Sequence, residues 1–473
     1  MQDNNTIAGI ASGMGGGIGI IRVSGNKALE IAGKIFRTRK YVDKKYGKIS
    51  EEVLWDSNFF IKKQSHTISY GYITDGDNIV DEVIVLLMKA PNSYTKEDVI
   101  EIDAHGGSLV VRKILELLLK NGAKLATPGE FTKRAFLNGR IDLSQAEAVM
   151  KIISSESEFA LNSAVKQLEG SVSAYIEEIR QKILHNLGLI EAALDDPEHY
   201  DLDLYRDDIL KDVEEEISKL TELIRRFDDG RIKSEGINTV IVGKPNAGKS
   251  SLMNLLLDEE RAIVTDIAGT TRDIIEEKVY LGNIILNLVD TAGIHETNDL
   301  VENIGVGKAI NYLEDSDFVI YVADSSVPMD DSDDQIIELL KNKKGVVLLN
   351  KSDLDVKLTE KEIKERLGWE CIEFSNKTKS GLGQLSKYIK DSFLHGDISF
   401  NDQVYLTNIR HKEAVKDSIE SLVKARDTIN SGLPEDFITI DMMDAYKKLG
   451  LINGETASED LVNKIFNDFC MGK

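Results

Sequence analysis

Runs rich in Ile, Val and Tyr mark the first part of this chain. They predict strands at 18–23, 66–73, 81–87 and 99–104. An apolar helical pattern follows at 109–120 and ends at Asn121-Gly122. Together these elements predict an α+β domain over residues 1–139.

From Ser144 the pattern changes to long amphipathic helices. The first is expected to break at Asp195-Asp196-Pro197, and a second at about 207–227 is expected to end at Gly230. The same helical pattern returns near Ile409 and continues to the C-terminus. Apolar residues spaced by three and four place one face of the first helix in a core: Ile176, Ile179, Ile183, Leu187, Ile190 and Leu194.

Strands alternate with helices between these two helical stretches, which is typical of a parallel sheet. The predicted strands are 238–242, 284–290, 318–323 and 345–349. A doubly wound domain is therefore expected to be inserted into a helical one, since the termini of a domain usually lie close together. The predicted domains are 1–139, 140–234 (helical, first part), 235–394 (inserted) and 395–473 (helical, second part).

Composition limits the class of protein. The 473 residues carry 58 Lys and Arg against 81 Asp and Glu, which argues against a protein whose whole surface coats nucleic acid but leaves room for a local basic patch. The sequence contains no run of about 18 apolar residues, so it predicts no membrane span, and no signal or transit peptide is recognisable. Cys371 and Cys470 are the only cysteines, which excludes a disulfide framework. We expect a cytoplasmic protein with no membrane contact.

Residues 243–250 form a phosphate-binding loop, Gly-Lys-Pro-Asn-Ala-Gly-Lys-Ser, between a predicted strand and a predicted helix. Its glycines allow backbone N–H groups to approach phosphate oxygens, Lys249 reaches the terminal phosphates, and the Ser250 hydroxyl binds Mg²⁺. The Asp290 carboxylate can hold the magnesium shell, and Gly293 can sense the γ-phosphate. A hydroxyl of the 270–271 pair, Thr271, is expected to be the second metal ligand.

The motif at 350–353, Asn-Lys-Ser-Asp, predicts guanine selection. The Asp353 carboxylate can accept hydrogen bonds from N1–H and the exocyclic amine of guanine, a pair of donors that adenine lacks. Residues 375–377 complete the pocket, although Asn376 departs from the usual Ser-Ala-Lys. Ile294 stands where many relatives of this fold carry a water-orienting Gln, so hydrolysis must use other groups.

The motifs in this order predict a GTPase. The expected nucleotide contacts lie in the phosphate loop (Asn246, Ala247, Gly248, Lys249, Ser250, Ser251), the following loop (Thr265, Asp266, Ile267, Ala268, Gly269, Thr270, Thr271), the Asp-x-x-Gly turn (Asp290, Thr291, Ala292, Gly293) and the guanine pocket (Asn350, Lys351, Ser352, Asp353, Ser375, Asn376, Lys377).

Three segments outside these motifs resemble the MnmE (TrmE) family of tRNA modification GTPases: 17–25, 128–143 and the terminal Cys-Met-Gly-Lys. Segment 265–273 also matches the family. The resemblance implies a multidomain α/β protein with an N-terminal α+β folate-binding-like domain, a helical domain and an inserted Ras-like GTPase domain. It also implies a homodimer that joins the flavin-dependent GidA/MnmG protein in a heterotetramer. The complex would add a carboxymethylaminomethyl group to C5 of the wobble uridine of certain tRNAs, with a tetrahydrofolate derivative as carbon donor.

The resemblance also assigns residues. Arg22, Glu97, Arg140 and Lys473 align with folate-binding positions, and Cys470 with the catalytic tail, where no nucleophilic role is assigned to it. Asn246, with Thr265, Ile267 and Thr270, would hold K⁺, and Glu302 would orient the attacking water. The sequence departs from the family at 12–17, which is shortened, and at Lys96, Arg140 and His295, where Gly, Lys and Arg are usual.

The sequence leaves open an alternative function and the role of one cationic cluster. A regulatory GTPase switch in ribosome assembly or signalling would share the nucleotide motifs and lack the folate domain and the terminal motif. The cationic cluster Lys133, Arg134 and Arg140 would bind folate or tRNA, or only line a surface. Cys371 is expected to be core packing.

Overall fold

A computed structural model describes residues 5–38, 42–43, 48–49, 56–196, 205–258, 276–281, 284–289, 312–314, 316–393, 404–467, 469 and 472. The chain forms two compact units. The first comprises Met1–Ser154, Ala164–Leu220 and Glu413–Lys473, and the second Ser155–Ser163 and Thr221–Lys412. The boundaries of the four predicted domains stay predictions.

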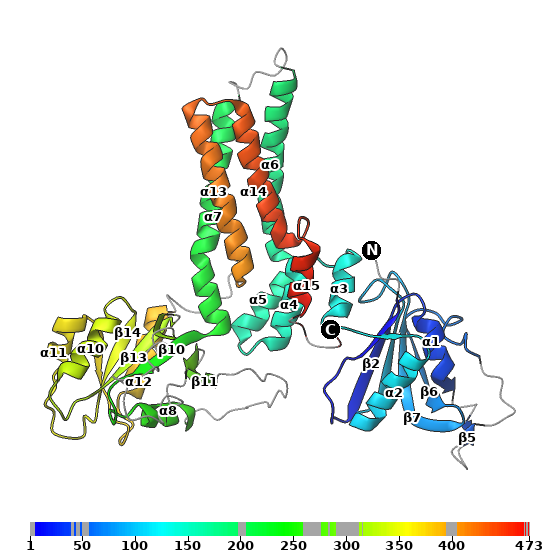
Figure 1. The fold of residues 1–473 in the computed structure, drawn as a ribbon, viewed down its shortest axis with the longest axis horizontal. Helices are drawn as coiled ribbons and strands as arrows, with labels where there is room; N and C mark the ends of the chain where they lie inside the picture. Colours follow the sequence, from blue (N-terminus) through cyan, green and yellow to red (C-terminus); the bar gives the residue numbers. More distant parts are fainter. Residues whose placement is uncertain are drawn as a thin grey trace. The chain divides into compact units, whose positions relative to one another are not determined.

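The N-terminal region is a mixed sheet covered on one face by two helices, α1 (Ala28–Ile35) and α2 (Ser108–Lys120) (Figure 1). All four predicted strands and the predicted helix are confirmed. The main strand order is β3-β6-β7-β8-β2-β1-β9, and β5 also pairs with β4 and β7. The strands are β1 (Ile7–Ile10), β2 (Ile18–Ser24), β3 (Phe36–Thr38), β4 (Val42–Asp43), β5 (Lys48–Ile49), β6 (Thr67–Asp75), β7 (Asn78–Met88), β8 (Val99–His105) and β9 (Lys124–Leu125).

Strand alternation gives this sheet two different faces. On β7, Val83 and Val85 are buried in the core that α1 and α2 complete. The intervening Ile84 points to the other face and is 42% exposed, as is its cross-strand partner Tyr70 at 48%. Ile68, two residues from Tyr70, is 67% exposed. We call this apolar surface, made by Ile68, Tyr70 and Ile84, the open face of the sheet.

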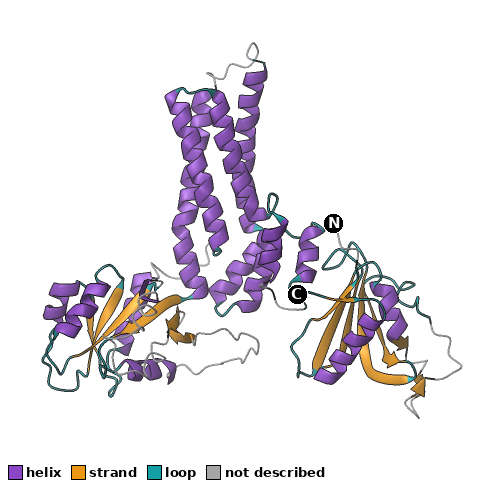
Figure 2. Cartoon of the chain, viewed as in Figure 1, coloured by secondary structure: helices purple, strands orange, loops and turns teal. Residues whose placement is uncertain are grey.

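Helices make up the described remainder of the first unit (Figure 2). Five of the six apolar positions predicted for the first long helix are buried, whereas Leu194 is exposed because the helix is near its end there. The helices outside the inserted domain are α3 (Glu130–Leu137), α4 (Leu143–Ser154), α5 (Glu158–Leu168), α6 (Ser171–Asp195), α7 (Arg206–Glu235), α13 (Ile409–Ser431), α14 (Glu435–Asn453) and α15 (Glu459–Asn467).

The predicted helix end at Gly230 is wrong, because α7 continues to Glu235. Gly230 is buried, and a Cβ atom there would lie 3.2 Å from the Leu406 carbonyl oxygen. Its role is therefore close packing. The helix ends at Gly236, whose φ of +93° is the left-handed conformation common at helix C-termini.

A buried arginine joins α6 to the end of α14. Arg180 is fully buried, and its Nη2 lies 2.6 Å from Glu455 Oε2 while its Nη1 lies 2.8 Å from Glu177 Oε2. Its guanidinium carbon lies 4.3 Å from the centre of the Tyr446 ring. A buried cation is tolerated only when it is paired in this way.

The C-terminal segment packs on α3. The rings of Phe466 and Phe469 lie 4.9 Å apart, and Phe466 also contacts Phe136 of α3. Gly129, at the start of α3, has a φ of +67°, and a Cβ atom there would lie 2.6 Å from the Phe466 carbonyl oxygen. The family-like segment at 128–143 therefore packs against Phe466 and Phe469.

The inserted domain is a doubly wound sheet, as predicted. Its order is β11-β12-β10-β13-β14-β15, parallel except for the β11–β12 pair. Helices α8 and α12 pack on one face of the sheet and complete the core there. Helices α10 and α11 complete a second core on the other face. The elements are β10 (Ile237–Val242), α8 (Lys249–Asp258), β11 (Glu276–Leu281), β12 (Ile284–Val289), β13 (Phe318–Asp324), α10 (Asp331–Leu340), β14 (Gly345–Asn350), α11 (Glu360–Leu367), β15 (Glu370–Glu373) and α12 (Leu382–Phe393).

One smaller prediction concerns Cys371, the expected core cysteine. Cys371 is buried on β15, and burial raises the pKa of its thiol to about 11, so the expected core role is confirmed. Within the described ranges, no helix combines the length and the apolar character needed to cross a bilayer.

Candidate functional site

The phosphate loop lies between β10 and α8, where backbone geometry requires its glycines. Gly243 has a φ of +152°, and a Cβ atom there would lie 2.3 Å from the Val322 carbonyl oxygen. Gly248 has a φ of +106°. Asn246, the predicted potassium ligand, is exposed and left-handed, with a φ of +64°. The loop therefore presents backbone N–H groups and the Asn246 side chain at the start of a helix.

Lys249 begins α8 and folds back over the loop. Its Nζ donates to the carbonyl oxygens of Gly243 at 2.7 Å and Lys244 at 2.9 Å. Burial lowers the pKa of this ammonium, and a phosphate anion would offset that penalty. Ser250 and Ser251 are exposed in the same first turn, so a metal ion could reach the Ser250 hydroxyl.

Lys244 is a second lysine that anchors the phosphate loop, and the sequence pattern did not single it out. Lys244 Nζ lies 2.6 Å from Asp333 Oδ2 and 2.9 Å from Asp330 Oδ2, at the start of α10. Asp333 is buried and also accepts a 2.8 Å hydrogen bond from the Tyr321 hydroxyl. The acidic residues that begin α10 were the only available signal, and acidic residues are common at helix starts.

The guanine-pocket motifs meet the phosphate loop at the carboxyl ends of β14 and β15. Asn350 is buried, and its Nδ2 donates to the Ala247 carbonyl oxygen at 2.7 Å. Asp353 is exposed and accepts a 2.7 Å hydrogen bond from the Ser375 hydroxyl, which holds the pKa of its carboxyl below the usual range. Lys351 pairs with Asp324 at 2.5 Å. Asp353 thus stays ionised and presents its carboxylate to solvent, as recognition of guanine requires.

The structure brings together 246–251, 350–353 and 375–377 of the predicted nucleotide contacts. The other predicted contacts, at 265–271 and 290–293, lie outside the described residues, as do Glu302, Cys470 and Lys473. Among the residues that the structure describes, no group of three or more His, Cys, Asp or Glu is arranged to hold a metal ion.

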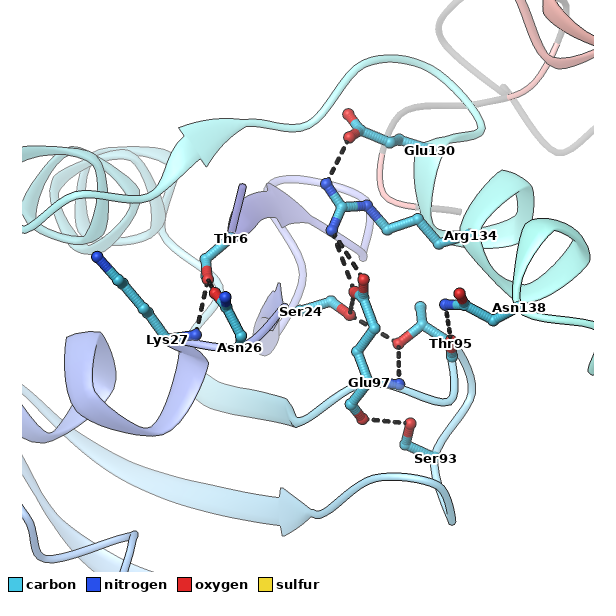
Figure 3. A network of polar contacts seen from close by, with 10 residues as sticks. All are labelled: Thr6, Ser24, Asn26, Lys27, Ser93, Thr95, Glu97, Glu130, Arg134 and Asn138. Carbon is cyan, nitrogen blue, oxygen red and sulfur yellow. Dashed lines mark hydrogen bonds and ion pairs between the residues drawn. The ribbon is translucent and has the colours of Figure 1, made fainter. Parts of the chain in front are cut away.

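A second polar site lies in the N-terminal region (Figure 3). The Glu97 carboxylate accepts hydrogen bonds from Arg134 at 3.1 Å and from the Ser24 hydroxyl at 2.7 Å. Arg134 is only 8% exposed and also pairs with Glu130 at 2.9 Å. The cationic cluster proposed from the sequence is therefore not one surface. Arg134 is buried, and the carboxylates of Glu97 and Glu130 neutralise its charge inside the fold.

Arg22 and Arg140 share one aromatic ring. Their guanidinium carbons lie 5.5 Å and 4.7 Å from the centre of the Tyr94 ring. Arg22 also pairs with Glu101 at 2.7 Å and donates to the Gly472 carbonyl oxygen at 3.4 Å. The terminal motif therefore reaches the predicted folate residue Arg22.

Two of the predicted folate residues, Glu97 and Arg140, line different hollows. Glu97, with Arg134 and Lys133, lines a cavity of about 730 Å³. Arg140 lines a separate hollow of about 460 Å³ with Tyr94 and Lys96. Lys96, where the family usually has Gly, keeps the left-handed backbone with a φ of +58° and donates to the Gly139 carbonyl oxygen at 2.8 Å. Lys96 and Glu97 are neighbours in the chain and line different hollows.

Known protein families and curated relatives match this chain along nearly its whole length. A family model described as the GTP-binding protein TrmE N-terminus matches residues 6–140, and one described as the MnmE helical domain matches residues 143–470. A tRNA modification GTPase MnmE of Lachnoclostridium phytofermentans is 49% identical over 470 residues, 99% of each chain. The chain belongs to the MnmE family of tRNA modification GTPases.

A further relative agrees with this assignment. A tRNA modification GTPase MnmE of Thermoanaerobacter pseudethanolicus is 47% identical over 473 residues, again 99% of each chain. The G domain of the T. maritima FeoB iron transporter is 29% identical, covers 33% of this chain and 97% of that one, and has a TM-score of 0.26. As an MnmE family member the chain is a GTP hydrolase, and the multidomain α/β architecture with an inserted GTPase domain is confirmed.

Replacing Asp353 with Asn tests the guanine assignment. The amide can accept only one of the two guanine donors, so we expect GTP affinity to fall by on the order of 100-fold. Xanthine nucleotides should gain affinity, because their O2 can accept a hydrogen bond from the new amide. Titration with labelled GTP and XTP measures both changes.

Asp355→Asn is the matched control, since Asp355 is also exposed and lies two residues further along the same loop. It should leave both affinities unchanged. Unaltered GTP affinity in Asp353→Asn would exclude the assignment. Because the pKa of Asp353 is lowered, the affinity for guanosine, which has no phosphate that titrates in this range, should stay constant between about pH 7 and pH 5.

Proposed function

We propose that this MnmE family GTPase acts with a flavin-dependent GidA/MnmG partner to place a carboxymethylaminomethyl group on C5 of the wobble uridine of certain tRNAs. GTP hydrolysis in tRNA modification follows from family membership along the whole chain. The observation that carries the finer proposal is the contact between Arg22 and the terminal Gly472, which joins the predicted folate site to the family's terminal motif. We place the protein in the cytoplasm.

A regulatory GTPase switch is the weaker alternative. Such a protein needs only the nucleotide domain, whereas here the N-terminal and helical regions match the family as well. The relatives that match over the whole chain are named tRNA modification GTPases, and this supports tRNA as the substrate.

A tetrahydrofolate derivative fits the donor set beside Tyr94. Folates end in a glutamate whose carboxylates pair well with arginine, and Arg22 and Arg140 both lie against that aromatic ring. When bound, the folate would supply the transferred carbon. Glu97 would complete the site from the cavity that it lines. The family resemblance also assigns Lys473 to the folate site and Cys470 to the catalytic tail.

GTP hydrolysis would use two cations in place of the missing Gln. The exposed Ser250 hydroxyl, with Thr271, fits Mg²⁺, and the exposed Asn246 amide oxygen fits the weakly hydrated K⁺. Thr265, Ile267 and Thr270 would complete the potassium shell, which neutralises charge that develops on the phosphates. Glu302 would orient the attacking water.

The open face of the N-terminal sheet supports a homodimer. Ile68, Tyr70 and Ile84 are exposed together on neighbouring strands, and clustered apolar side chains of this kind mark interaction surfaces. A second copy of the chain would bury this surface, and the dimer would then join the flavin-dependent partner in a heterotetramer.

The potassium proposal predicts that K⁺ stimulates GTP hydrolysis and Na⁺ does not. An arginine finger in the same role contributes about 10³ to 10⁵ in rate, so we expect a stimulation of at least about 10². Asn246→Ala should lose it, whereas Asn254→Ala, which is exposed on α8, should keep it. Equal turnover in potassium and sodium chloride at matched ionic strength would exclude this mechanism.

The folate proposal predicts separate effects on the two activities. Deletion of residues 470–473 should abolish tRNA modification in the presence of the partner while GTP hydrolysis stays close to normal. Met471→Ala is the control, since the family motif leaves that position open. A truncated protein that still modifies tRNA at the normal rate would disprove the role of the tail.

The dimer proposal predicts a sedimenting species of twice the 52.6 kDa chain mass. The double substitution Tyr70→Lys and Ile84→Lys should shift it to the monomer, because four charged ammonium groups would meet across the two-fold interface. Leu109→Lys, on the helical side of the same domain and 77% exposed, should not. An unsubstituted chain that sediments as a monomer, or a double variant that stays dimeric, would contradict this interface.

A further inference from the structure

The middle residue of the 375–377 motif makes a contact that the usual alanine cannot make. Asn376 Nδ2 donates to the Gly248 carbonyl oxygen of the phosphate loop at 3.1 Å. Beside it, Asn350 Nδ2 donates to the Ala247 carbonyl oxygen at 2.7 Å. Two side-chain amides of the guanine pocket therefore hold two consecutive carbonyl groups of the phosphate loop.

Gly248 leaves just enough room for this contact. A Cβ atom at Gly248 would lie 2.8 Å from Asn376 Nδ2 and 2.1 Å from Asn350 Nδ2. The two amides also support each other, because the Asn376 backbone N–H donates to Asn350 Oδ1 at 3.2 Å. Asn376 thus adds a second tether beside the one that Asn350 already provides.

Adjacent residues of this loop reach the two ends of the nucleotide site. Ser375 donates to Asp353, the expected guanine ligand, and Asn376 donates to the phosphate loop. Ser375 is itself held by a bridge to Ser380. A movement of the guanine loop away from the phosphate loop must break the Asn376 bond.

The Asn376 side chain gives little net stability to the fold. Its Oδ1 is buried and has no hydrogen-bond partner among the residues that the structure describes. An unpaired buried acceptor is unfavourable and offsets the bond made by Nδ2. Loss of the side chain should therefore change nucleotide handling more than folding.

We infer that Asn376 is a positioning residue that ties the guanine loop to the phosphate loop and slows the release of guanine nucleotide. The inference rests on the nucleotide site proposed above. An alanine at this position keeps the backbone N–H and cannot reach Gly248, so a chain with the usual Ser-Ala-Lys would release nucleotide faster.

Stopped-flow release of fluorescent mant-GDP from the full chain tests this inference. Loss of one such hydrogen bond corresponds to about a two- to tenfold change, so Asn376→Ala should raise the release rate by that factor. The melting temperature without nucleotide should not change. Asn376→Asp, which has the same shape but places an oxygen against the Gly248 carbonyl, should release nucleotide at least as fast as Asn376→Ala.

Thr378→Ala is the matched control, because Thr378 is exposed in the same loop and its hydroxyl donates to Ser380. It should leave the release rate unchanged. Release from Asn376→Ala at the normal rate, or a matching fall in its melting temperature, would overturn the inference. Failure of the unsubstituted chain to bind mant-GDP would instead overturn the nucleotide site.

Discussion

Arg180 places a positive charge inside the helical region, and the neighbouring helices are arranged to neutralise it. Its partner Glu455 lies 275 residues further along the chain, beyond the whole inserted domain. Neither helix can bury its face alone, so α6 and α14 pack only when both halves of the chain have been made. Glu455 directly follows Gly454, the left-handed residue that ends α14. Beyond it α15 contacts α3, and Gly472 accepts a hydrogen bond from Arg22.

The nucleotide site depends on a different kind of constraint, which is local. Parallel strands place their carboxyl ends at one edge of the sheet, so the loops after β10, β14 and β15 must meet there. The left-handed Gly248 then lets the Asn350 and Asn376 side chains approach the backbone closely enough to hold it, and Gly243 lets the Val322 carbonyl lie close to the loop. Asn350 and Asn376 hold two consecutive carbonyl groups of the phosphate loop, and Lys244 ties the loop to Asp333, so the loop is shaped before it meets phosphate.

In the N-terminal region, charge pairing decides which residues can meet a ligand. Arg134 and Lys133 follow each other in the chain, yet Arg134 is buried between two carboxylates while Lys133 binds Asn463 on α15. Arg140 remains exposed against Tyr94. One basic segment therefore has three different roles: internal neutralisation, attachment of the C-terminal helix, and a surface available to an anion.

The sequence alone predicted β2, β6, β7 and β8 of the N-terminal sheet and β10, β12, β13 and β14 of the inserted one. It also predicted the inserted domain and the motifs that meet at its edge, because apolar spacing and short motifs encode local geometry. It misread Gly230, which is a packing site inside α7, and it grouped Arg134 with the surface cations. It also could not show that Arg180 pairs with Glu455, Lys244 with Asp333, or Asn376 with Gly248. Each of these contacts joins residues far apart in the chain. Their partners depend on how separate elements pack, and only the tertiary structure decides that.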